Sequence, residues 1–307
     1  MASFEMFIKK MKKEMGERFG SAYTIEVQNV LKNNGVRKTG LMVKRDGKTA
    51  SPVIYLDAYY EAYQEGRSMK EMINEVYDMY NTFERQDIPL EMLKDFENMK
   101  DKVYYKLVNY ENNKKSLENM PHMRYLDLAV TFGILIERSR NGQMTTQIEN
   151  KQMRYWGMDA ESLYDLAEEN TPRLFPSSLE SMPDVLKKII KEHMGSGYDE
   201  ELFGDLLPAQ TETPMFIVGN TSGVNGAAVI LYKNVLKDFA EAEKTDLVIL
   251  PCSVHETLLI PYDGEADMKD FKEMVMHINR TEVPKDEVLS DSVYLYKRES
   301  DKIYLAL

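Results

Sequence analysis

The spacing of the strand-like segments constrains the fold of this chain more than any other feature. These segments come in pairs, such as 126–136 with 144–148 and 247–250 with 254–260, and single helical segments lie between the pairs. The connections within a pair are too short for the crossover that joins two parallel strands. The sequence therefore predicts an α+β fold with mixed or antiparallel sheets and packed helices, rather than a doubly wound parallel sheet.

The helices are marked by apolar stripes and by residues suited to capping. Apolar side chains recur at three- and four-residue intervals from Phe4 to Phe19, behind Ser3, whose hydroxyl can cap a helix. Ser68 and Glu71 form a capping box in front of a second stripe. Further helices are predicted at 160–169, 182–194, 235–242 and 268–278.

A change in composition suggests where the chain divides. The segment 195–213 is acidic, contains glycine and proline, and has no sustained periodicity, so we expect a linker or long loop there. This boundary predicts two α/β subdomains. The first is an N-terminal α+β domain over 1–194, and the second is a C-terminal α+β domain over 214–307.

Three local predictions rest on short-range rules. The segment 103–109 could continue a preceding helix or form a strand, and its β-branched and aromatic content favours the strand. A helix should end at Asn170–Pro172, because the residue before proline avoids the α region. The glycine-rich run Gly219–Gly226 lacks the Gly-Lys-Ser/Thr ending of a phosphate-binding loop, so we interpret it as a hairpin connection between strands at 215–218 and 227–232.

The charge balance disfavours one class of partner. Lys plus Arg is 39 and Asp plus Glu is 51, which gives 39 − 51 = −12. Direct binding to nucleic acid needs clustered Lys and Arg to displace counterions, so no basic patch for nucleic acid is expected. An acidic mimic of nucleic acid stays open as an alternative, although positive charges are interspersed along the whole chain.

The cellular compartment is inferred from cysteine content and hydropathy. A single cysteine, Cys252, cannot form a disulfide within the chain. No apolar stretch approaches the ~18–20 residues of a membrane span, and no secretory apolar region follows the N-terminal lysines. We therefore expect a cytoplasmic protein without membrane association.

Short motifs lie along the whole chain, and they include Leu31–Gly35, Thr39–Leu41, Pro52–Leu56, Leu107–Tyr110, Asn170–Pro172, Leu250–Glu256, Leu289–Asp291 and Tyr294–Tyr296. Together they resemble the motifs of an uncharacterised bacterial family, domain-of-unknown-function family 5688. The order of elements is more faintly similar to that of unknown-function family 1444. The resemblance implies a bacterial cytoplasmic protein and brings no activity, cofactor or catalytic residue. The family pattern often has serine where this chain has Cys252, which argues against an essential thiol.

The most suggestive chemical cluster is the run from Cys252 to Glu256. On a strand Ser253 and His255 would point to the same side, so a nucleophile and a base could share one face. Glu256 is a further candidate for such a site. However, no Gly-x-Ser-x-Gly elbow surrounds the serine, and a polar strand end with a hydrogen-bonded histidine explains the same residues.

Metal binding has weaker support. His255 and Glu256 are not followed by a second histidine one helical turn later, as the zinc-protease signature requires. His122 follows a proline in a predicted loop, and it could join His255 only through the fold. We therefore name His122 and His255 as weak metal candidates and expect no cofactor.

These observations favour a non-enzymatic binding or regulatory protein whose partner is another protein. The alternative is a hydrolase-like enzyme that uses Ser253 and His255. The acidic nucleic-acid mimic is the second alternative. The leading hypothesis rests on the weakness of every catalytic pattern in the sequence.

Overall fold

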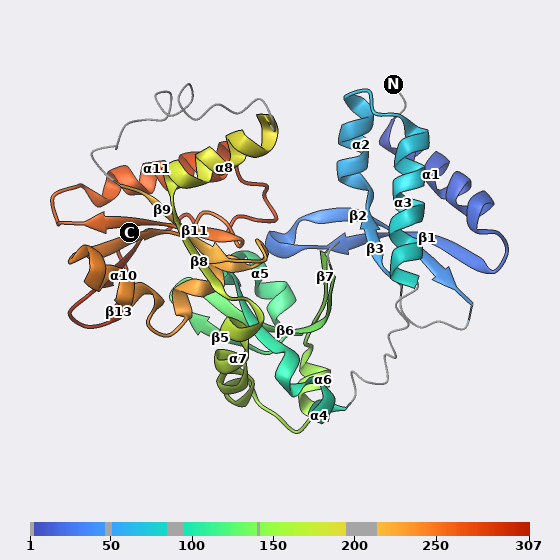
Figure 1. The fold of residues 1–307 in the computed structure, drawn as a ribbon. Coiled ribbons are helices and arrows are strands. Elements are labelled where there is room, and N and C mark those ends of the chain that lie inside the picture. Colours follow the sequence, from blue (N-terminus) through green and yellow to red (C-terminus); the bar gives the residue numbers. More distant parts are fainter. Residues whose placement is uncertain (1–2, 47–50, 85–94, 140–141, 195–213) are drawn as a thin grey trace. The chain divides into compact units, whose positions relative to one another are not determined.

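The computed structural model describes residues 3–46, 51–84, 95–139, 142–194 and 214–307. The chain divides into two compact units, 1–95 and 96–307 (Figure 1). All strand pairs in the described part of the chain are antiparallel, and helices pack on the sheets, so the predicted α+β class is confirmed. No helix in this part of the chain is long and apolar enough to cross a membrane.

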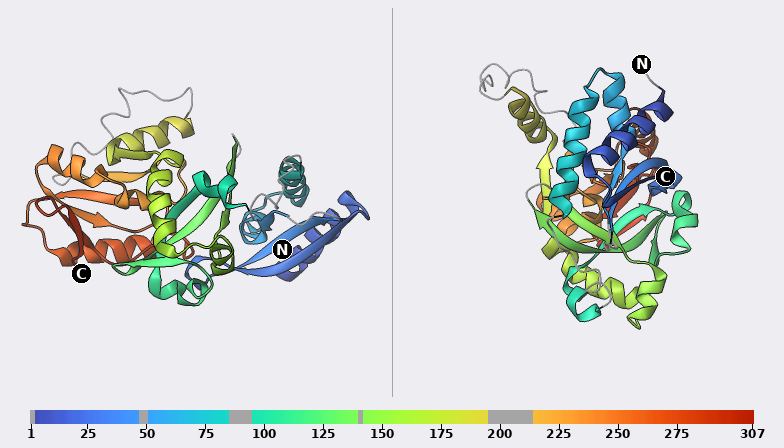
Figure 2. Two further views of the ribbon diagram at one scale, coloured as in Figure 1. Left: turned by 90° about the horizontal axis from the view of Figure 1, so that it is seen from below. Right: turned by 90° about the vertical axis from the view of Figure 1, so that its right-hand side faces the viewer.

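In its described residues, the first unit combines the helices α1, α2 and α3 with a sheet in the order β1-β2-β3 (Figures 1 and 2). The predicted helix over 4–19 is confirmed, and the Ser3 hydroxyl accepts a hydrogen bond from the Met6 amide at 3.3 Å. The elements are α1 (Phe4–Phe19), β1 (Tyr23–Leu31), β2 (Arg37–Arg45), β3 (Val53–Tyr55), α2 (Leu56–Gln64) and α3 (Met69–Glu84).

One core holds this unit together. The α1 side chains Phe7, Met11 and Met15 are fully buried and belong to the same cluster as Leu41 of β2 and Met72 of α3. Each fully buried side chain of this size contributes about 1.5–3 kcal/mol relative to an exposed one. The apolar stripe of α1 therefore packs on one face of the sheet and against α3.

The described residues of the second unit form a four-stranded and a six-stranded sheet. In the four-stranded sheet β6 pairs with β4, β5 and β7, and β4 confirms the strand predicted at 103–109. Its elements are α4 (Phe96–Met99), β4 (Val103–Asn109), α5 (Tyr110–Leu117), β5 (His122–Tyr125), β6 (Leu128–Ser139), β7 (Gly142–Gln147), α6 (Asn150–Tyr155) and α7 (Ala160–Leu174).

The six-stranded sheet of this unit has the order β13-β12-β10-β11-β9-β8. Helix α11 packs on it, with Phe271 and Val275 in one buried cluster with Val248 and Ile260. The elements are β8 (Ser177–Ser181), α8 (Met182–Met194), β9 (Phe216–Asn220), the 3₁₀ helix η5 (Gly226–Leu231), α10 (Val235–Glu243), β10 (Asp246–Leu250), β11 (Glu256–Tyr262), α11 (Met268–Thr281), β12 (Tyr294–Lys297) and β13 (Lys302–Leu305).

The compact units differ from the predicted domains. The predicted linker at 195–213 lies outside the described residues, and the units divide between Asp95 and Phe96 instead. Strand β8, from the predicted N-terminal domain, pairs over its full length with β9, from the predicted C-terminal domain. Two strands that share backbone hydrogen bonds belong to one sheet, so both sides of 195–213 are parts of the same unit.

The predicted hairpin around Gly219–Gly226 is wrong. Strand β9 pairs with β8 and β11, and the predicted strand at 227–232 is largely the 3₁₀ helix η5. The backbone of Gly226 passes so close to its neighbours that an added Cβ would lie 2.3 Å from the His255 carbonyl oxygen. This tertiary contact, with left-handed Asn225 (φ 55°) beside it, turns the chain away from a hairpin.

The predicted helix end at Asn170–Pro172 is also wrong, because α7 continues through Pro172. Asn170 Nδ2 donates to the Lys100 carbonyl oxygen at 2.7 Å, and Thr171 Oγ1 accepts from the Tyr105 amide at 3.0 Å. Both side chains are buried. These bonds attach the last turn to the start of β4, and tertiary contacts outweigh the local preference of the residue before proline.

Candidate functional site

The segment that contains Ser253 and His255 is a bend between β10 and β11 rather than part of a strand. Ser253 forms only an isolated bridge with Val288. The His255 amide donates to Ser253 Oγ at 3.0 Å, so the serine hydroxyl stabilises the turn that begins at Ser253. The alternation expected of a strand therefore does not place the serine hydroxyl and the imidazole side by side.

Both nitrogens of the His255 ring already face other groups. Nδ1 accepts a hydrogen bond from the Asn225 amide at 3.3 Å, and Nε2 lies 3.7 Å from Glu287 Oε2. Since Nδ1 accepts, this network assigns the proton of the neutral ring to Nε2, which faces the carboxylate. A general base needs a free lone pair within reach of the nucleophile. The imidazole offers none to Ser253.

The carboxylate next to the imidazole is Glu287 rather than Glu256. Glu256 begins β11, is exposed, and forms no hydrogen bond or ion pair with His255. Glu287 is brought close because its carbonyl oxygen accepts from the Val254 amide at 2.8 Å. Sequence reasoning missed Glu287, because no local pattern connects it with a histidine far along the chain.

Cys252 lies next to this turn and is a buried free thiol. Burial raises the pKa of the Cys252 thiol to about 12, and the nearby negative charge of Asp291 acts in the same direction. The thiolate is the nucleophilic form of cysteine, and at neutral pH this residue carries almost none of it.

The two histidines named as metal candidates lie in different elements of the second unit: His122 is in β5, and His255 is in the bend before β11. His122 begins β5, and its Nδ1 lies 2.9 Å from the Met120 carbonyl oxygen. Among the residues that the structure describes, no three His, Cys, Asp or Glu side chains gather as a metal site requires. His122 and His255 therefore have no described neighbours that would complete a coordination shell.

A second polar cluster, which we call the Asp127 clasp, was not predicted. Asp127 Oδ1 accepts from the Tyr294 hydroxyl at 2.5 Å, and Oδ2 accepts from Ser290 Oγ at 2.5 Å and Ser292 Oγ at 3.0 Å. Tyr294 and Ser290 are buried. Asp127 lies between β5 and β6, and Tyr294 lies on β12, so the clasp joins the two sheets of the second unit.

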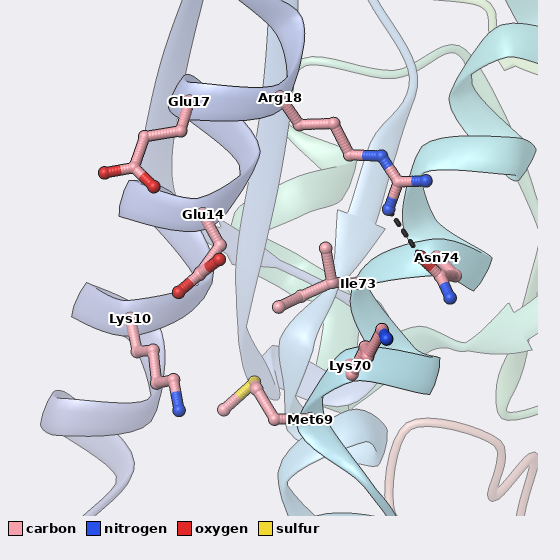
Figure 3. Close-up of a pocket in the computed structure, with 8 residues that line it drawn as sticks. All are labelled: Lys10, Glu14, Glu17, Arg18, Met69, Lys70, Ile73 and Asn74. Atoms are coloured by element: carbon pink, nitrogen blue, oxygen red, sulfur yellow. Dashed lines mark hydrogen bonds between the residues drawn. The ribbon is translucent and has the colours of Figure 1, made fainter.

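The first unit has an open groove between two helices, which we call the α1–α3 groove (Figure 3). Its volume is about 540 Å³, and the apolar side chains Met69 and Ile73 lie between the charged residues of the two helices. Arg18 Nη1 donates to Asn74 Oδ1 at 2.6 Å and connects α1 to α3. The remaining lining residues are Lys10, Glu14, Glu17 and Lys70.

The lysines and the glutamates of this groove lie at different positions along its length. Lys10 and Lys70 lie near Met69, while Glu14 and Glu17 lie farther along α1 towards Arg18 (Figure 3). Neither lysine forms an ion pair with a described residue. Two unpaired ammonium groups beside an apolar floor can hold an acidic side chain of a bound segment.

Comparisons with known proteins place the chain in a family. The model of a family of unknown function, DUF5688, matches residues 4–298 of the 307-residue chain. The searches for similar curated proteins and for similar solved structures gave no match. The match extends over both compact units, and the chain therefore belongs to the DUF5688 family.

Proposed function

We propose that this protein is a non-enzymatic binding protein that docks a segment of a partner protein in the α1–α3 groove. The observation that carries the proposal is the groove itself, where an apolar floor lies next to two lysines that form no ion pair with any residue of the described ranges. The Ser253–His255 turn gives weaker support to the hydrolase alternative, because both ring nitrogens face groups other than the serine.

The groove favours an amphipathic partner segment of defined chemistry. An apolar side chain would lie on Met69 and Ile73, where the flexible thioether can adapt to its shape. An acidic side chain would bind between Lys10 and Lys70. A basic side chain farther along would face Glu14, so the segment has one preferred direction.

Site-specific crosslinking tests this proposal. A photoreactive amino acid at Glu17 should capture a partner protein, whereas the same amino acid at Met79, an exposed position on α3 outside the groove, should not. The purified partner should then bind the double variant Lys10→Glu/Lys70→Glu at least about tenfold more weakly. Equal capture at both positions, or unchanged affinity of the double variant, would contradict the proposal.

We also propose that the protein works in the cytoplasm, where a free thiol such as Cys252 stays reduced. The acidic nucleic-acid mimic has less support from this groove, because basic and acidic side chains line it together. The mimic hypothesis predicts that the protein competes with DNA for a basic protein and that this competition weakens as the salt concentration rises. Binding of a partner segment in the groove predicts no such competition.

A further inference from the structure

A second groove lies within the second unit and is independent of the α1–α3 groove. Its volume is about 430 Å³, which is within the usual range of small-molecule sites. Half-buried Tyr125, Leu231 and Ile303 contribute its apolar surface. We call it the Tyr125 groove. It forms where the end of β5, the segment after η5 and the β12–β13 turn meet.

The exposed rim of the Tyr125 groove is mainly basic. Lys233, Lys237 and Lys302 line it, and Asp301 is the single carboxylate among the lining residues. This excess of positive charge contrasts with the net charge of −12 of the whole chain. A basic rim on an acidic protein attracts an anion locally.

The existing contacts leave part of this charge available. Lys233 pairs with Glu168 at 2.8 Å, and Lys237 lies 3.9 Å from Asp301. The Asp301 carboxylate also accepts from the Tyr296 hydroxyl at 2.7 Å, so it is already engaged. Lys302 forms no ion pair with any residue that the structure describes.

Tyr125 differs from the other two tyrosines of the groove. The hydroxyl of Tyr232 donates to the Phe175 carbonyl oxygen at 3.0 Å, and that of Tyr296 donates to Asp301. The Tyr125 hydroxyl has no hydrogen-bond partner in the described part of the chain. Burial raises the pKa of Tyr125 to about 12, so at neutral pH its hydroxyl keeps its proton and can donate.

We propose that the Tyr125 groove binds a small organic anion, with its apolar body on Tyr125, Leu231 and Ile303 and its phosphate or carboxylate group held by Lys237 and Lys302. The hydroxyl of Tyr125 supplies a hydrogen bond to the same ligand. The apolar surface and the lysines both contribute to binding in this proposal. Inorganic phosphate has no apolar body and a neutral aromatic molecule has no charge, so each should bind more weakly than a ligand that has both.

Calorimetric titration of the full chain at low salt tests this site. Phenyl phosphate should bind saturably with a Kd of about 1 mM or lower, and inorganic phosphate and phenol should each bind at least about tenfold more weakly. Benzoate, titrated in parallel, shows whether the groove prefers a carboxylate or a phosphate. Absence of saturable binding by both phenyl phosphate and benzoate would overturn the proposal.

Two matched double variants locate the binding. Lys237→Glu/Lys302→Glu should weaken phenyl phosphate binding about tenfold or more. Lys187→Glu/Lys191→Glu changes the same net charge at exposed positions on α8 and should leave the affinity unchanged. Equal weakening in both variants would show a general charge effect and refute a specific site. All four lysines are exposed, so circular dichroism should show an unchanged fold.

Discussion

The Asp127 clasp and the Ser253–His255 turn contain similar side chains and use them differently. In the clasp one carboxylate accepts three hydroxyl hydrogen bonds, and Tyr294 and Ser290 are buried. In the turn the serine accepts from a backbone amide, and the imidazole side chain keeps 31% of its surface exposed. The residues that resemble a catalytic site are thus partly exposed, whereas the carboxylate of the unpredicted cluster bonds to two buried hydroxyl groups and one half-buried one.

The difference shows that residue type alone does not separate stabilising from catalytic roles. A hydrogen bond to a charged group contributes about 1.5–3 kcal/mol, and an orphaned buried partner costs a similar amount. The clasp should therefore contribute much more to the free energy of unfolding than the turn does. The following experiments test that ranking.

The largest effect is expected from removal of the clasp carboxylate. Asp127→Ala leaves the hydroxyls of Tyr294 and Ser290 without their acceptor, so the free energy of unfolding should fall by about 3 kcal/mol. Urea denaturation followed by circular dichroism measures it. Asp127→Asn keeps an acceptor and should lose less. A loss below about 1 kcal/mol in Asp127→Ala would remove the contrast between the two clusters.

Alkaline pH should lower the free energy of unfolding through Cys252, the buried residue next to the turn. Its pKa is about 12 in the folded chain, against about 8.5 in an unfolded one, so the folded state keeps a proton that the unfolded state loses. The free energy of unfolding therefore falls as pH rises, by about 2 kcal/mol from pH 8 to pH 10.

The matched control for this pH effect is Cys252→Ala, which lacks the thiol. The difference in unfolding free energy between the two proteins should change by about 2 kcal/mol over the same pH range. The same burial should keep the thiol of the folded wild type unreactive towards a thiol reagent at pH 8. Parallel pH profiles would show that the thiol titrates as it does in an unfolded chain.

Removal of one hydroxyl from the clasp should have a smaller effect. Tyr294→Phe keeps the ring and leaves Asp127 with its two serine donors, so a loss of about 1 kcal/mol is expected in urea denaturation. The control is Tyr304→Phe on β13, where the side chain is 46% exposed and the change should be close to zero. A larger effect at Tyr304 than at Tyr294 would contradict the role of the clasp.

The smallest effects should come from the turn itself. Ser253→Ala and His255→Ala should each change the free energy of unfolding by about 0.5 kcal/mol, because both residues are only half-buried. Both variants should retain the binding of the crosslinked partner. If a variant that still folds and binds the partner no longer supports the function of the protein in its host, that result would favour the hydrolase alternative instead.

Several helix starts could be predicted from the sequence because they depend on interactions between residues close together in the chain. The helix over 4–19 begins at the predicted Ser3 cap. The helix predicted from residue 160 begins there, behind Asp159, whose carboxylate accepts from the Ser162 amide at 2.8 Å. Capping and apolar periodicity act within a few residues, so sequence reasoning can identify them. The strand at 103–109 was predicted for the same kind of reason.

The candidate site shows which features such local rules cannot predict. The cluster from Cys252 to Glu256 was recognised from residue type, but its conformation depends on Glu287 and on the amide of Asn225, which is 30 residues before His255. The Asp127 clasp joins residues more than 160 positions apart. Local patterns carry no information about such pairs.

The sequence by itself determined the fold class, the starts of the helices that it predicted and the acidic charge of this protein, since each depends on composition or on neighbouring residues. Only the tertiary structure decided the unit boundary at residue 95, the passage of α7 through Pro172 and the 3₁₀ turn after Gly226. These features arise from contacts between distant segments, and such contacts outweigh local preferences when the groups that make them are buried.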